Sequence, residues 1–77
     1  MEKIIVDKIK EKLQDSDVRV EGGESKFTVF VASNIFLDKS MIEQHKIIYS
    51  ILDEYIKSGE IHALTLKTSP KQNDEQS

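Results

Sequence analysis

The sequence contains no cysteine. Without a thiol, the chain cannot form a disulfide, a thiolate metal site or a cysteine nucleophile, and this composition fits a reducing compartment. No serine precedes a histidine in a recognisable catalytic pattern, and Gly22-Gly23 lacks the downstream glycine and lysine of a phosphate-binding loop. We therefore predict that the protein is not an enzyme.

Long apolar runs and an excess of basic residues are also missing. The longest apolar stretches are a few residues, and the first three residues are mostly charged, so we expect no membrane span, no secretion signal and a cytoplasmic location. Lysine and arginine total 11 against 14 aspartates and glutamates, giving a formal charge of −3. Proteins that bind nucleic acid usually carry a basic stripe, whereas these charges are interspersed, so nucleic acid is a disfavoured partner.

The pattern of apolar residues predicts the element order α-β-β-α-β. Helices are predicted over residues 2–14 and 40–58, and strands over residues 18–21, 27–32 and 61–67. The crossover through the second helix should be right-handed, which makes the last two strands parallel, while the short loop between the first two makes them antiparallel. The expected fold is α+β: a three-stranded mixed sheet with both helices on one face.

The ends of the second helix are marked by their own signals. Ser40 and Glu43 have the spacing of a capping box, and Gly59 is placed to end the helix in a left-handed conformation. The expected core side chains are apolar and periodic: Ile5, Ile9, Leu13, Val29, Val31, Leu52, Ile56, Leu64 and Leu66.

We expect one domain over residues 1–70, which is monomeric when free. Residues 71–77 carry no apolar side chain. A helical turn could begin at Ser69-Pro70, but it would have no core to pack against. A disordered C-terminal tail over 71–77 is therefore predicted.

The second helix is apolar over an unusually wide arc, about 200° when about 100° suffices for one core face. One flank of this arc consists of Ile47, Ile51 and Tyr55. Either the first helix covers this flank, or the flank is an exposed strip that binds a partner protein. His45 falls within the same arc and is interpreted as a hydrogen-bonded packing residue.

Both histidines lie in two recognisable segments, 44–49 (QHKIIY) and 61–64 (IHAL). Their order after a phenylalanine-containing strand, over residues 5–70, resembles the BolA-like family. The resemblance implies the BolA-like fold, a relative of the type II KH fold. It also implies an adaptor that binds a monothiol glutaredoxin and takes part in iron–sulfur cluster assembly, trafficking or iron regulation.

The resemblance gives His62 a specific role. In this family the histidine of the segment 61–64 is described as a ligand of a [2Fe–2S] cluster that is shared with the glutaredoxin, and imidazole is a known ligand of such clusters. His62 would therefore lie at the centre of the partner-binding surface, to which Ile47, Ile51 and Tyr55 are the other candidates. Alone, the chain is expected to hold no cofactor. Without the resemblance, a lone histidine at the start of a strand is more often structural.

The sequence departs from the family pattern at the second ligand. The family's second ligand is usually a histidine or cysteine in the loop between the first two strands. This chain has Lys26 there, and a cationic ammonium group is a poor ligand. Glu24 offers only a hard oxygen donor, which suits an iron–sulfur cluster badly. Protein binding is therefore the better supported part of the inherited function.

The alternative function is that of a KH-like nucleic-acid-binding regulator of transcription or the stress response, which rests on fold alone. Two further departures count against it. Asp38 stands where the family has a glycine, and Gln44 stands where it has an arginine. These changes are expected to remove a flexible turn and a positive charge.

Overall fold

The predicted order of elements is confirmed. A computed structural model describes residues 1–71 of the chain. Its elements are α1 (Glu2–Lys12), β1 (Asp17–Gly23), β2 (Lys26–Ala32), a short 3-10 helix η1 (Asn34–Phe36), α2 (Met41–Ile51), α3 (Asp53–Ser58) and β3 (Ala63–Ser69). Within residues 1–71, no helix is long and apolar enough to cross a membrane.

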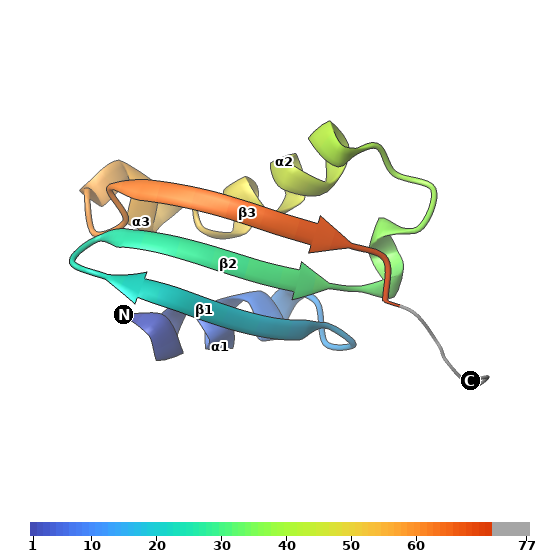
Figure 1. Ribbon diagram of the computed structural model, residues 1–77, viewed down its shortest axis with the longest axis horizontal. Coiled ribbons are helices and arrows are strands. Elements are labelled where there is room, and N and C mark those ends of the chain that lie inside the picture. The colour runs from blue at the N-terminus through green and yellow to red at the C-terminus, as the bar shows by residue number, and fades with distance from the viewer. Residues whose placement is uncertain (72–77) are drawn as a thin grey trace.

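The three strands form one mixed sheet in the order β1-β2-β3 (Figure 1). β1 and β2 are antiparallel, whereas β2 and β3 are parallel, as the crossover rule predicts. The helices lie on one face, with α1 next to β1, and with α2 and α3 on the β3 side. Within residues 1–71, no helix covers the other face of the sheet, which is called the open face below.

The central strand β2 has apolar side chains on both of its faces, because both faces are at least partly buried. Val29 and Val31 are buried on the face that carries the helices, while Phe30 is half-buried on the open face. The guanidinium carbon of Arg19, the residue paired with Phe30 on β1, lies 4.2 Å from the centre of the Phe30 ring. This cation–π contact covers an aromatic ring that no helix covers.

The core differs from the prediction at the ends of the elements. Ile56 and Leu64 were expected to be mostly buried, but both are only partly buried against the core. The buried apolar residues are Ile5, Ile9, Leu13, Phe27, Val29, Val31, Phe36, Ile48, Leu52, Ile61 and Leu66. Phe36 and Ile61 enter the core from connecting segments, where no periodic pattern marks them.

The prediction of a single helix over 40–58 is wrong in one respect. The capping box is present, because the Glu43 amide donates to Ser40 Oγ and the Ser40 amide donates to Glu43 Oε1. The helix is interrupted at Leu52, where φ is −98° and ψ is 9°. The Tyr55 amide then donates to the Leu52 carbonyl, which is the tighter 3-10 pattern. Gly59 ends α3 in the left-handed conformation, as predicted.

The chain is tied down beyond β3 by Lys71, the first residue of the predicted tail. Its amide donates to the Ser33 carbonyl over 3.2 Å, and its Nζ donates to the Asp15 carbonyl over 2.8 Å. Lys71 Nζ also lies 3.8 Å from Asp17 Oδ1. The rest of the predicted tail, residues 72–77, lies outside the described residues, so its disorder stays a prediction.

Asp15 stabilises the turn that carries η1, and this contact predicts a dependence of stability on pH. Asp15 Oδ2 accepts a hydrogen bond of 2.8 Å from the Asn34 amide, and Oδ1 accepts one of 3.0 Å from Ser33 Oγ. The Asn34 amide, more than any other group, lowers the pKa of Asp15 from its ordinary value of 3.8. Because the folded state has the lower pKa, this stabilisation is present above the unfolded pKa and is lost as pH falls through the folded pKa.

Asp15→Asn should therefore be less stable than wild type at pH 7, and the difference should shrink as pH falls below about 4. Urea unfolding at pH 7, 4 and 3 measures this difference. Glu11→Gln, an exposed change on α1, is the matched control and should show no such trend. A difference for Asp15→Asn that is the same at all three pH values would contradict the assignment.

Candidate functional site

His62 lies in the connection between α3 and β3, and its residue is exposed. Two hydrogen bonds fix the backbone there, since the amides of His62 and Ala63 both donate to the Ser25 carbonyl, over 2.7 and 3.0 Å. The preceding residue, Ile61, is buried, and its amide donates to the Tyr55 carbonyl over 3.0 Å. Ile61 therefore anchors the segment in the core, while His62 faces outward at a fixed place.

The turn between β1 and β2 lies directly beside His62. Glu24 and Ser25 have φ values of 53° and 74°, so the turn is left-handed at both central residues. At Gly22, where φ is 115°, an added Cβ would lie 2.2 Å from the Lys26 carbonyl oxygen, so only glycine fits. Lys26 begins β2 and is paired with Ala63 in the sheet. The structure thus brings together the two segments that the family resemblance connects.

The donors at this end of the sheet supply one good ligand for a soft metal cluster. The His62 imidazole provides a nitrogen, whereas Glu24 provides a carboxylate and Lys26 a cation. Within residues 1–71, no group of three or more histidine, cysteine, aspartate or glutamate residues is placed to hold a metal ion. His62 therefore fits the role of one ligand of a [2Fe–2S] cluster, but the turn offers no suitable second ligand.

A shallow hollow of about 660 Å³ lies next to the same turn. Exposed Met1 and Ile4 from the start of α1 contribute apolar surface, and Glu24, Ser25 and Glu60 contribute polar surface. Ser25 also holds the His62 backbone. Sequence reasoning missed this apolar contribution because Met1 and Ile4 belong to an element that is distant in the chain.

The second predicted group, Ile47, Ile51 and Tyr55, does not form an exposed strip. All three side chains are partly buried against the core cluster. The exposed apolar residues of α2 lie on the other flank of the helix and are Met41, Ile42 and Tyr49. The apolar arc is as wide as the sequence indicates, but its uncovered part is on the β3 side.

Gln44 and Asp38 have structural roles that the sequence did not reveal. Gln44 is only 5% exposed. Its side-chain oxygen accepts a hydrogen bond from Thr68 Oγ1 over 2.7 Å, and this bond joins α2 to β3. Its side-chain nitrogen donates to the Lys39 carbonyl over 3.0 Å. Asp38 has a φ of 67°, so the left-handed turn that we expected to lose with the family's glycine is kept.

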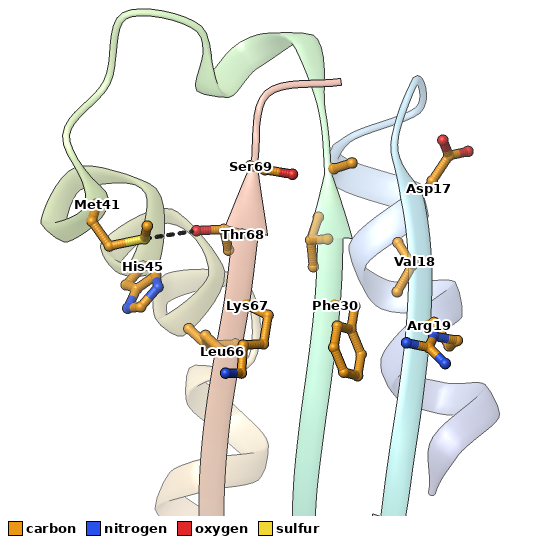
Figure 2. Close-up of a pocket in the computed structure, with 12 residues that line it drawn as sticks. Asp17, Val18, Arg19, Phe30, Met41, His45, Leu66, Lys67, Thr68 and Ser69 are labelled. Atoms are coloured by element: carbon orange, nitrogen blue, oxygen red, sulfur yellow. Dashed lines mark hydrogen bonds between the residues drawn. The ribbon is translucent and has the colours of Figure 1, made fainter. Parts of the chain in front are cut away.

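His45 is partly buried on α2 and lines a second hollow together with Met41 and Thr68 (Figure 2). Its Nε2 is shielded from solvent and has no hydrogen-bond partner among the described residues. His45 is therefore a packing residue, as expected from the sequence, but without the hydrogen bond expected at that nitrogen.

Comparison with known proteins finds BolA-like proteins both among related sequences and among solved structures. A BolA-like protein of Dictyostelium discoideum is 46% identical over 46 residues, which are 60% of this chain and 40% of that protein. The solved structure of the BolA domain of SufE1 from Arabidopsis thaliana is similar with a TM-score of 0.80 and 28% identity, covering 90% of both chains.

A BolA protein homologue from Coxiella burnetii is similar with a TM-score of 0.79 and 30% identity, covering 91% of this chain and 90% of that one. The family model described as BolA-like protein matches residues 3–73. This match includes all described strands and helices except the first residue of α1. The chain therefore belongs to the BolA-like protein family.

Proposed function

We propose that this chain is an adaptor that binds a monothiol glutaredoxin and takes part in iron–sulfur cluster assembly, trafficking or iron regulation. The observation that carries the proposal is the placement of His62, which is exposed beside the β1–β2 turn. Membership of the BolA-like family supports it, since the family model matches residues 3–73, which include the segment 61–64.

In the proposed complex, the two proteins share the ligands of the cluster. His62 supplies one imidazole nitrogen for a shared cluster, and the remaining ligands come from the partner, because Lys26 leaves the loop position without a suitable donor. The hollow lined by Met1 and Ile4, together with polar residues of the turn, provides contact area that does not depend on the cluster. Binding of the apo partner is therefore expected as well.

The test is a titration of the isotope-labelled chain with a monothiol glutaredoxin, both apo and loaded with a [2Fe–2S] cluster. Amide shifts should map to residues 23–26 and 60–63 and to the start of α1 in both titrations. The visible spectrum of the loaded glutaredoxin should also change on mixing. The proposal is wrong if neither form shifts these amides at protein concentrations of about 100 µM, because even weak signalling contacts have dissociation constants of about this size.

The alternative function, nucleic-acid binding, leads to a prediction of its own. Gln44 is buried, and the chain has a net charge of −3, so the family's arginine position offers no cation to a phosphate. Binding to a 20-base-pair duplex at 150 mM salt should be weaker than about 10 µM and should fall further with salt. Fluorescence anisotropy at 50 and 150 mM salt measures this. A nanomolar, sequence-selective complex would favour the regulator.

A further inference from the structure

Among the described residues, the outer edge of β3 has no strand beside it. Within residues 1–71, the only strand next to β3 is β2. The Ala63 amide and the Ser69 carbonyl both bond on the β2 side, to Ser25 and Ser33. Because backbone groups alternate sides along a strand, the amides and carbonyls of Leu64, Leu66 and Thr68 point away from β2. This edge therefore carries three donors and three acceptors.

The exposed flank of α2 lies beside this edge. Met41, Ile42 and Tyr49 are exposed, and Ile42 is exposed by 68%. Ile42 and Tyr49 share the helix face of His45, because they stand three residues before it and four residues after it. Figure 2 shows Met41 and His45 next to β3, on the side away from β2. They line one end of a hollow of about 720 Å³, which continues across β3 over the residues of β2 and β1, among them Phe30 and Arg19. His45 Nε2, which has no partner among the described residues, lies in this region.

The sheet is too narrow for the helix layer behind it. Three strands at about 4.8 Å spacing cover about 14 Å. Two helices side by side, each about 10 Å across, need about 20 Å. The difference is close to the width of one strand. The exposed apolar side chains of α2 include Met41, which lies beside β3 on the side away from β2, where a fourth strand would lie.

We propose that the β3 edge and the exposed flank of α2 accept an extended segment of a second protein as a fourth strand. A strand satisfies the alternating donors and acceptors of the edge, which a sugar–phosphate chain does not. Side chains on one face of the segment would pack on Met41 and Tyr49, so they should be apolar. On the open face, Lys67 forms no ion pair with residues 1–71, and it favours an acidic residue opposite it.

A second copy of the chain is the weaker occupant. Antiparallel pairing of two β3 strands about a two-fold axis would place both α2 helices on the same face of the joined sheet. Each α2 extends past the edge of its own β3, so the two helices would compete for the same space. A partner segment without a helix behind it avoids this clash. The site uses neither His62 nor the β1–β2 turn, so it is separate from the proposed glutaredoxin surface.

The experiment uses a capped twelve-residue peptide in which valine and threonine alternate around a central aspartate, with serines at both ends. Binding should shift the amides of Leu64, Leu66 and Thr68 in NMR spectra and slow their hydrogen exchange. The same peptide with four consecutive central amides methylated should bind more than about tenfold more weakly, because it loses the backbone hydrogen bonds. Ile42→Ser should weaken binding without unfolding the chain, because Ile42 is exposed.

A charge exchange tests the chemistry of the segment. Lys67→Glu should weaken binding of the aspartate peptide about threefold and strengthen binding of a peptide with lysine in its place. Lys10→Glu, an exposed change on α1, is the matched control and should alter neither.

The proposal is overturned if no peptide binds at millimolar concentration, if the shifts map to the β1 edge, or if the methylated peptide binds equally well. It is also overturned if a dimer of the chain or a ten-nucleotide oligothymidine protects the same three amides.

Discussion

Replacing Phe36 by alanine should lower the free energy of unfolding by about 3–5 kcal/mol. Phe36 is a fully buried side chain, although it belongs to a three-residue 3-10 helix. Its carbonyl accepts from the Lys39 amide over 3.1 Å, so the backbone around it is held and cannot easily collapse into the cavity. Small domains have total stabilities of about 5–15 kcal/mol, so this loss would be a large share.

Urea unfolding measures the loss, and an unchanged m-value would show that the variant unfolds from a folded state of normal compactness. The adjacent residue offers a matched control. Leu37 is 64% exposed, and Leu37→Ala should change the free energy of unfolding by less than about 0.5 kcal/mol. A loss below about 1.5 kcal/mol for Phe36→Ala would mean that the core closes without this ring.

Phe36 also illustrates where the sequence stops being informative. Regular periodicity was sufficient to predict both helical segments, the three strands and the topology, because a buried face repeats along each of these elements. Phe36 and Ile61 lie in short connections, where no repeat exists. Their burial depends on the way in which the connections fold back, which is set by contacts such as that of Gln44 with Lys39 and Thr68.

The interruption at Leu52 was not predictable for a related reason. The usual signals for a helix break are glycine and proline, and neither is present between Ser40 and Ser58. The sequence also left open whether the flank of Ile47, Ile51 and Tyr55 is covered or exposed, and in the structure these side chains are partly buried. Periodicity gives the width of the apolar arc, but the width of the sheet decides which part of that arc is covered.

The candidate site was predictable in part. The resemblance identified His62 and the loop before Lys26 as neighbours, and the bonds to the Ser25 carbonyl place them side by side. The exposure of His62 could not be derived from alternation along β3. It results from the buried neighbour Ile61, which takes the inward place just before the strand begins.

Replacing His62 by alanine should separate the two parts of the proposed function. His62 is exposed, so the free energy of unfolding should change by less than about 0.5 kcal/mol. Binding to cluster-loaded glutaredoxin should weaken by about tenfold or more, as expected for the loss of a metal ligand. Binding to the apo partner should change little, because the hollow at Met1 and Ile4 is intact. Calorimetric titration of both partner forms measures the difference.

Three further variants make this test specific. His62→Cys restores a ligand of another kind, so it should recover tight binding with a shifted visible spectrum. Lys26→His supplies a nitrogen at the loop position beside His62, so it should strengthen the loaded complex and leave the apo complex unchanged. His45→Ala should mainly lower the free energy of unfolding, because His45 is partly buried on α2. If His62→Ala binds the loaded partner as tightly as wild type and with the same spectrum, His62 is not a ligand. The interaction would then depend on the surface at the start of α1.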